Sequence, residues 1–384
     1  MMQFLGSLLT FLPLLALLAL LLGVLVLARC SREEPAAPPG APWAGRTSCY
    51  RHIRAHLDPA GGLGPAGEQL PDEELAAKNS PLRWAPGAKD GVLGHHVGEG
   101  KKEVEELFAA LRAAVRRADG AGRAVLYPLL LKHPALGYVD PLLEQVAASD
   151  ALDPARLYEL ALWLATEAPD REPVKVGLAL LGIIQGPESR ALFLTLGAHE
   201  EFTLFSAVAL LRTEEQPDAA LWELARKVRG WGRIHAVERL AATKDPRIKD
   251  WLLREGFRNT VMDEYLAGIC ARAGDLPAAL DQEEPDDGLL DAAGAIVEAL
   301  IRGGPAEDLD DYEDGAEVVE RLLYHLNARA PTPRRRRTVE ALREFLQDER
   351  ADWAAREKRG WPPEKRSLLL ERCVEIGERP APRP

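Results

Sequence analysis

The amino-acid sequence predicts an all-α protein in which an N-terminal transmembrane helix and a flexible linker precede a right-handed α-solenoid of stacked helix pairs. Three observations support this prediction. The run from Phe4 to Ala28 carries no charge, the next stretch is rich in Pro and Gly, and the remainder repeats helical apolar patterns about every 30 residues. The predicted boundaries are 1–30 for the anchor, 31–100 for the linker, 101–346 for the solenoid, and 347–384 for capping helices and a tail.

The composition favours helices and excludes several classes of function. Aromatic residues make up only 6% of the 384 residues, whereas strands are rich in aromatic and β-branched residues. The formal net charge of −12 argues against general nucleic-acid binding, which requires a basic face. The cysteines have no C-x-x-C spacing, so neither a disulfide scaffold nor a zinc knuckle is expected. Cys270 lies on an apolar helical stripe and is predicted to be a core thiol.

The N-terminal run is long enough to span a membrane. A bilayer core of about 30 Å requires about 20 apolar residues in a helix, and residues 4–28 exceed this length. A cleaved signal peptide is the alternative, but no Lys or Arg precedes the run. The sequence Leu27-Ala28-Arg29-Cys30 resembles a lipoprotein cleavage site, except that Arg29 stands where a small residue is usual. We therefore expect an uncleaved, single-pass anchor.

The charges around this run predict its orientation. Arg29, Arg32 and Arg46 follow the run, and only the α-amino group precedes it. Because basic residues are enriched on the cytoplasmic side of membrane spans, the C-terminal body is predicted to lie in the cytoplasm, at the cell membrane.

The expected linker, residues 31–100, lacks sustained periodicity and is predicted to be mostly disordered. Within it, 48–57 and 71–78 are predicted to form marginal helices. Residues 62–67 match G-x-G-x-x-G, but a turn rather than a strand precedes them, so a dinucleotide loop is not expected. His95 and His96 have no further metal ligand at a suitable spacing, and an exposed pair is expected.

The solenoid is predicted from helical segments that recur at a fixed distance. Residues 202–211, 231–240 and 261–270 share an apolar pattern and lie about 30 residues apart, while Pro217 and Pro246 head the intervening segments. Each helix is too short to be stable alone and must bury its apolar stripe on a neighbour. Asp-Pro pairs at 140–141, 153–154 and 245–246 are predicted to begin helices, and Gly186, Gly230, Gly256 and Gly274 to end them.

These units resemble short HEAT-type repeats, including those of phycobilisome-lyase-like proteins, in the Asp-Pro that heads one helix and in Ala236-Val237-Glu238-Arg239-Leu240 of the other. The segment 231–267 is similar to bacterial HEAT-repeat proteins, some of which carry the name limonene hydroxylase. That name implies monoterpene oxidation with NAD(P)H. The sequence has no credible Rossmann loop, haem-thiolate setting or flavin motif, so no cofactor is expected.

A candidate binding patch for a protein partner centres on the segment from Trp231 to Arg239. On a helix His235, Glu238 and Arg239 share a face with Trp231, and Arg and Trp often dominate interface energetics. The candidate residues are Trp231, Arg233, His235, Glu238, Arg239, Arg258, Asp263 and Glu264. The competing interpretation is a helix cap and an inter-repeat salt bridge.

The remaining charged runs are expected to be structural. Residues 281–287 and 307–314 are acidic and are predicted to be solvated loops, because the spacing of the second fails as a calcium loop. The run 334–337 is predicted either to bind anionic lipid or simply to precede a helix, 338–359. That helix and 363–376 are expected to cap the array.

Taken together, these features favour a non-catalytic scaffold or adaptor, anchored through residues 4–28, that binds a protein partner on the solenoid surface. No catalytic residue, metal site, nucleic-acid partner or small-molecule substrate is expected. Two alternatives stay open: the monoterpene-oxidising oxidoreductase implied by the family name, and a structural assembly factor that acts through membrane helix contacts.

Overall fold

The computed structural model describes residues 41–79, 84–93, 101–117, 120–184, 186, 189–304 and 306–380. The expected anchor at 4–28 and the His95-His96 pair lie outside these residues. None of the helices in the described ranges combines the length and apolar character needed to cross a bilayer.

The described chain is helical, with one isolated β-bridge between Leu57 and Leu63. The elements in chain order are α2 (Cys49–Ala55), η1 (Pro65–Gly67), α3 (Glu73–Asn79), α4 (Ala88–Leu93), α5 (Lys101–Arg116), α6 (Gly120–Leu130), η2 (Ala135–Gly137), α7 (Val139–Ala147), α8 (Pro154–Glu167), α9 (Arg171–Leu181), α10 (Ser189–Gly197), α11 (Glu200–Thr213), α12 (Pro217–Lys227), α13 (Gly230–Glu238), α14 (Pro246–Trp251), the π-helical turn η3 (Leu252–Gly256), α15 (Glu264–Gly274), α16 (Leu276–Leu280), α17 (Asp287–Arg302), α18 (Gly315–Asn327), α19 (Pro333–Gln347), α20 (Trp353–Lys358) and α21 (Pro363–Glu378).

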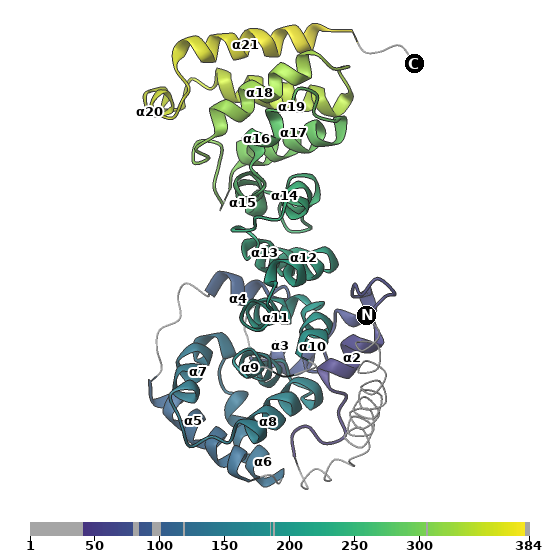
Figure 1. The fold of residues 1–384 in the computed structure, drawn as a ribbon, viewed down its shortest axis with the longest axis vertical. Coiled ribbons are helices and arrows are strands. Elements are labelled where there is room, and N and C mark those ends of the chain that lie inside the picture. The colour runs from purple at the N-terminus through teal and green to yellow at the C-terminus, as the bar shows by residue number, and fades with distance from the viewer. Residues whose placement is uncertain are drawn as a thin grey trace, which may run out of the picture.

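The helices form an elongated stack, as Figure 1 shows. Alternate helices α9, α11, α13, α15, α17 and α19 contact one another in succession, and α10, α12 and α14 pack beside them as a second layer. The predicted segments 202–211, 231–240 and 261–270 correspond to α11, α13 and α15. This all-helical arrangement is consistent with an α-solenoid.

The predicted punctuation is confirmed in part: Gly256 and Gly274 end helical segments as expected, whereas Gly186 lies beyond the end of α9 at Leu181. The carboxylates of Asp153 and Asp245 accept hydrogen bonds from backbone N–H groups of the first turns of α8 and α14, each of which has Pro at its first position. The third Asp-Pro pair differs, because α7 already begins at Val139 and Asp140 does not cap it. Gly230 does not end a helix either: α12 ends at Lys227, and Gly230 is the first residue of α13.

The N-terminal segment is the main departure from expectation. Residues 41–79 and 84–93, here called the strap, are folded along the stack rather than forming a flexible linker. Its helix α2 contacts α8 and α10, and α4 contacts α13. Cys49, Ile53 and Leu70 are buried. The two marginal helices predicted at 48–57 and 71–78 are observed as α2 and α3.

The C-terminal end is closed by α21, which packs on α18 and α19. The helix predicted at 338–359 is two helices, α19 and α20, because the backbone is extended at Asp348. The arginine run 334–337 lies in the first turns of α19. Arg335 is buried and forms ion pairs with Asp287 and Asp291, so this part of the run holds α19 against α17.

Candidate functional site

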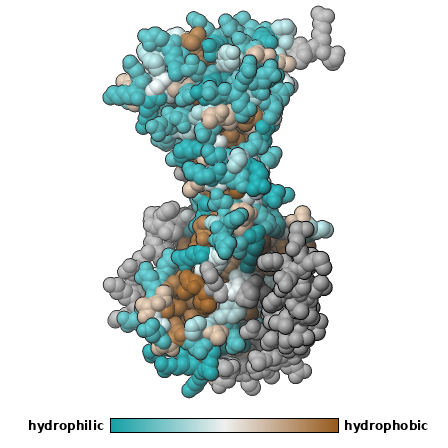
Figure 2. Space-filling view, in the orientation of Figure 1, coloured by the Kyte–Doolittle hydropathy of each residue, from teal (hydrophilic) through white to brown (hydrophobic). Residues whose placement is uncertain are grey.

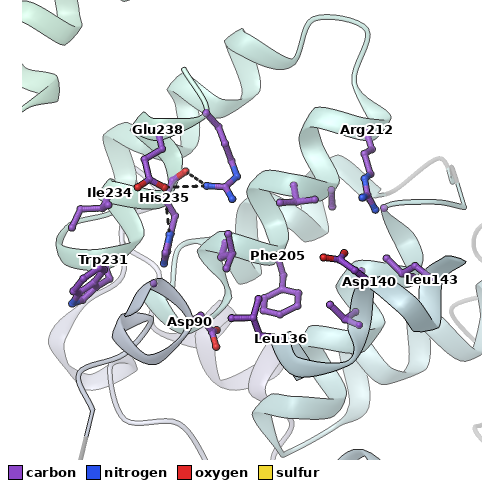
Figure 3. Close-up of a pocket in the computed structure, with 18 residues that line it drawn as sticks. Asp90, Leu136, Asp140, Leu143, Phe205, Arg212, Trp231, Ile234, His235 and Glu238 are labelled. Atoms are coloured by element: carbon purple, nitrogen blue, oxygen red, sulfur yellow. Dashed lines mark hydrogen bonds and ion pairs between the residues drawn. The ribbon is translucent and has the colours of Figure 1, made fainter. Parts of the chain in front are cut away.

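A groove of about 310 Å³ opens between α4, α7, α9, α11 and α13. This volume falls in the range of ligand-binding pockets. Figure 2 shows it as part of an apolar patch over α7 and α9, and Figure 3 shows the residues that line it. The apolar lining residues include Leu136, Val139, Leu143, Leu204, Phe205, Val208 and Ile234.

Small residues make the floor of the groove. Ala179 of α9, Gly182 just after α9 and Ala209 of α11 all line it. A Cβ on Gly182 would lie only 3.1 Å from the Cα of Ala209, so the two backbones are in close contact there. Because these residues have little or no side chain, the space above them stays open while larger side chains form the walls.

Four of the eight predicted patch residues line this groove: Trp231, His235, Glu238 and Arg239. The Arg239 guanidinium donates a hydrogen bond to the carbonyl oxygen of His235 at 2.7 Å and lies 3.5 Å from Glu238. Burial lowers the pKa of Arg239, and the Glu238 carboxylate opposes this effect. Glu238 and Arg239 therefore form a paired charge at one end of the groove.

The opposite end carries a second pair of opposite charges. Arg212 is in the last turn of α11 and Asp140 in the first turn of α7, and both are exposed. Figure 3 shows Arg212 and Asp140 together at this end of the groove. Within the described ranges neither residue forms an ion pair, and both line the groove.

The other four predicted residues, Arg233, Arg258, Asp263 and Glu264, do not line the groove, and the contacts of their side chains are structural. The Arg233 side chain donates hydrogen bonds to the carbonyl oxygens of Val228 and Arg258, at 3.1 and 3.0 Å. Burial lowers the pKa of Arg233. Asp263 accepts a hydrogen bond from the backbone N–H of Asn259, and Glu264 forms an ion pair with Arg302. For these residues, the competing prediction of structural caps and salt bridges therefore fits better than the prediction of a partner-binding surface.

The strap covers the predicted patch in a way the sequence did not reveal. His235 is buried, and its Nε2 lies 3.3 Å from the carbonyl oxygen of Gly87 in the strap. Gly91 of α4 faces the Trp231 ring so closely that a Cβ would come within 2.7 Å of it. The helix α4 thus forms one wall of the groove.

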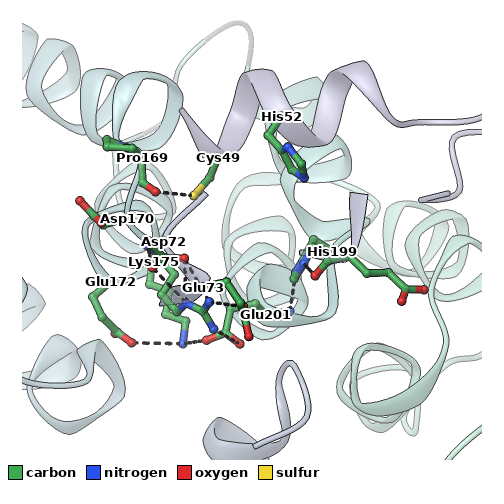
Figure 4. A network of polar contacts seen from close by, with 12 residues as sticks. Cys49, His52, Asp72, Glu73, Pro169, Asp170, Glu172, Lys175, His199 and Glu201 are labelled. Atoms are coloured by element: carbon green, nitrogen blue, oxygen red, sulfur yellow. Dashed lines mark hydrogen bonds and ion pairs between the residues drawn. The ribbon is translucent and has the colours of Figure 1, made fainter. Parts of the chain in front are cut away.

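A network of buried charges centred on Lys175 adjoins the groove and is shown in Figure 4. The Lys175 ammonium is 2.7 Å from Asp90 Oδ2, 2.6 Å from Glu201 Oε1 and 3.7 Å from Glu172 Oε1. Burial disfavours the charged amine, but the three carboxylates outweigh it and raise the pKa of Lys175 well above its usual value. The Lys175 ammonium is therefore the positive centre of this network.

The acids of this network respond differently to their surroundings. Burial alone would raise the pKa of Glu201, but Lys175 and Arg171 lower it to about 2. Burial raises the pKa of Glu172, although Lys175 and the backbone N–H of Ala135 oppose this shift. Asp90 is the network member that also lines the groove, so the two sites meet at this carboxylate.

Further ion pairs hold the strap to the stack. The Arg171 guanidinium binds Asp72, with Nη2 3.0 Å from Oδ1. Arg46 makes a bidentate pair with the buried Asp170, at 2.7 and 2.8 Å, and Asp170 also accepts a hydrogen bond from the Tyr127 hydroxyl. The Trp43 ring packs against Tyr127 in a tilted arrangement and against Trp163 edge to face. These contacts join residues too far apart in the sequence to form a local motif.

The thiols and carboxylates of the described chain show no arrangement suited to metal binding. No group of three or more His, Cys, Asp or Glu side chains within the described ranges is placed to hold a metal ion. Cys49, Cys270 and Cys373 are buried free thiols, and burial raises the pKa of each. The prediction that Cys270 is a core thiol is confirmed.

Comparison with known proteins adds no assignment: no protein-family model matches the chain, and neither the curated proteins nor the solved structures contain a significant match to it.

Proposed function

We propose that this chain is a non-catalytic helical-repeat adaptor that binds a protein partner in the groove between α4, α7, α9, α11 and α13. The observation that carries this proposal is an open groove with apolar walls. The buried ionisable residues next to it, such as Lys175 and Glu201, form ion pairs with one another, as structural charges do. Surface grooves that combine apolar walls with a charged rim are typical of binding sites.

We further propose that the stacked pairs are short HEAT-type repeats in a right-handed solenoid, and that residues 4–28 hold this body at the cytoplasmic face of the membrane. The repeat distance near 30 residues and the Asp-Pro helix starts support the first inference. The length of the uncharged run and the Arg residues that follow it support the second.

The experiment compares three full-length proteins in native membranes: the wild type, Val208→Arg and Val374→Arg. Val208 is half-buried in the groove wall, whereas Val374 is an exposed valine on α21. After chemical crosslinking and affinity purification, we expect the wild type and Val374→Arg to capture the same partner and Val208→Arg to lose it. Capture that is unchanged by Val208→Arg contradicts the proposal.

The two alternatives from the sequence are tested beside it. Limonene turnover by the purified protein with NAD(P)H would support the oxidoreductase. A chain without residues 1–30 that no longer binds the partner would support the membrane assembly factor.

A further inference from the structure

The groove also indicates what kind of partner segment it receives, an inference that rests on the proposed function. We propose that its occupant is an amphipathic α-helix of a protein partner, which places apolar side chains against Phe205 and Ile234 and an acidic side chain beside Arg212.

The apolar requirement follows from the walls. Leu143, Leu204 and Val208 line the same space as Phe205 and Ile234, and the five residues together come from three helices, α7, α11 and α13. An amphipathic helix in such a groove buries side chains spaced three and four residues apart while its polar face stays in water. The floor of Ala and Gly residues leaves room for these side chains.

The acidic requirement follows from the charges that remain unpaired. Glu238 lies against Arg239, and Asp90 against Lys175. Arg212 has no ion-pair partner in the described part of the chain and stands at the rim, where it can reach a carboxylate on the polar edge of a bound helix. Asp140 would in turn accept a basic side chain, so the rim selects a helix with charges of both signs.

Within the chain, one helix already packs against a wall of this groove. The short helix α4 lies against α13 with Gly91 on the Trp231 ring, and it directs Asp90 to the buried ammonium of Lys175. The helix α4 thus packs against the groove and pairs its acidic Asp90 with the basic Lys175. We assign the same combination, an apolar face and an acidic side chain that pairs with a basic residue of the groove, to the helix of the partner. The helix α4 occupies one wall and leaves the rest of the groove open.

The test uses the full-length protein and two fluorescein-labelled synthetic peptides, each designed as an amphipathic helix of about four turns. Both peptides carry the same Leu and Phe face and the same Lys at the position that meets Asp140, and they differ only in having Glu or Gln at the position that meets Arg212. By fluorescence anisotropy we expect the Glu peptide to bind about fivefold more tightly, because only its carboxylate can pair with the Arg212 guanidinium. Arg212→Glu should reverse this preference, and Val208→Arg should abolish binding of both peptides.

Arg229→Glu is the matched control, because Arg229 is exposed and does not line the groove. It should leave the preference unchanged. Equal affinity for the two peptides, or a preference that survives Arg212→Glu, overturns the inference. If that happens while Val208→Arg still abolishes partner capture from membranes, the proposed function stands and only the helix assignment fails. If Val208→Arg leaves capture unchanged, the proposed function itself fails.

Discussion

Lys175 of α9 and Asp90 of the strap form an ion pair of 2.7 Å in which both side chains are 2% exposed. The pair joins the segment before α5 to the middle of the helical stack, and its Asp90 also lines the groove. Burying a charge away from water costs free energy unless an opposite charge pairs with it. Because Lys175 is buried in the stack and Asp90 belongs to the strap, this pairing requires the strap to be docked. The strap is therefore a structural part of the repeat body and of its groove.

Lys175→Met should destabilise the protein strongly, because it leaves the carboxylates of Asp90 and Glu201 buried without their ammonium partner. Loss of one member of a buried pair typically costs about 3–5 kcal/mol. Urea unfolding measures this change. The control is Arg350→Met, which removes an exposed pair with Asp348 and should cost less than about 0.5 kcal/mol. Similar small losses for both variants would contradict the role of the network.

Stability should fall between pH 7 and pH 5 because of His199. Its Nδ1 accepts a hydrogen bond from the backbone N–H of Glu201 at the start of α11, and its Nε2 lies 3.1 Å from the carbonyl oxygen of Glu68 in the strap. Burial lowers the pKa of His199 to about 4. The unfolded chain, with a pKa near 6.5, binds more protons in this range, so acidification favours unfolding by about 2 kcal/mol at pH 5.

His199→Asn separates this effect from other titrations, because Asn caps a helix well but does not titrate in this range. The free energy of unfolding of the variant, from urea titrations at pH 7 and pH 5, should fall by about 2 kcal/mol less than that of the wild type. The contribution of Glu201 is lost only at lower pH, as the pH falls from its unfolded pKa through about 2. Parallel pH profiles for the two proteins would rule out His199 as the source.

Gly87→Ala should undock the strap from α11. Gly87 has φ +73°, and a Cβ there would lie 2.6 Å from the carbonyl oxygen of Glu200. We expect a loss of more than about 1 kcal/mol and faster hydrogen exchange in α4. Gly377→Ala is the matched control, because nothing lies within 4 Å of its added Cβ and it should be neutral or slightly stabilising. Unchanged exchange in α4 of Gly87→Ala would contradict the close approach.

Arg233→Met should lower stability and leave partner binding intact. The side chain donates to the carbonyl oxygens of Val228 and Arg258 and does not line the groove, so its removal should cost about 1–2 kcal/mol. Thermal unfolding and partner capture are measured on the same preparation. Loss of capture at an unchanged melting temperature would instead place Arg233 in the binding surface, as the sequence alone suggested.

The stack was predictable because each helix carries its own signal. Leu221 and Leu224 at helical spacing, and Asp245 before Pro246, are local patterns that survive in the structure. The strap was not predictable from periodicity, because its stability comes from single contacts such as Asp72 with Arg171, between residues distant in the sequence. One signal was present: Lys175 stands within the apolar stretch of α9, and a charge in such a place indicates a buried partner.

The binding site was predictable only in part, for the same reason. Trp231 and His235 were found because one helix brings them together. The groove also needs Leu143 from α7 and Phe205 from α11, and their meeting depends on how successive repeats pack. The prediction also assigned Arg233 and Glu264 to the patch. Helical spacing alone does not show whether such a side chain faces solvent, a backbone carbonyl oxygen, as Arg233 does, or a charged residue of a neighbouring helix, as Glu264 does.

The most direct measurement of the central claim is site-specific photocrosslinking in native membranes, with a photoreactive amino acid at Val208 in the groove or at Val374 on α21. Both positions are valines in helices, but only Val208 lines the groove. We expect a defined protein adduct from position 208 and none of the same mass from position 374. The same adduct from both positions, or an adduct from position 374 alone, would contradict it.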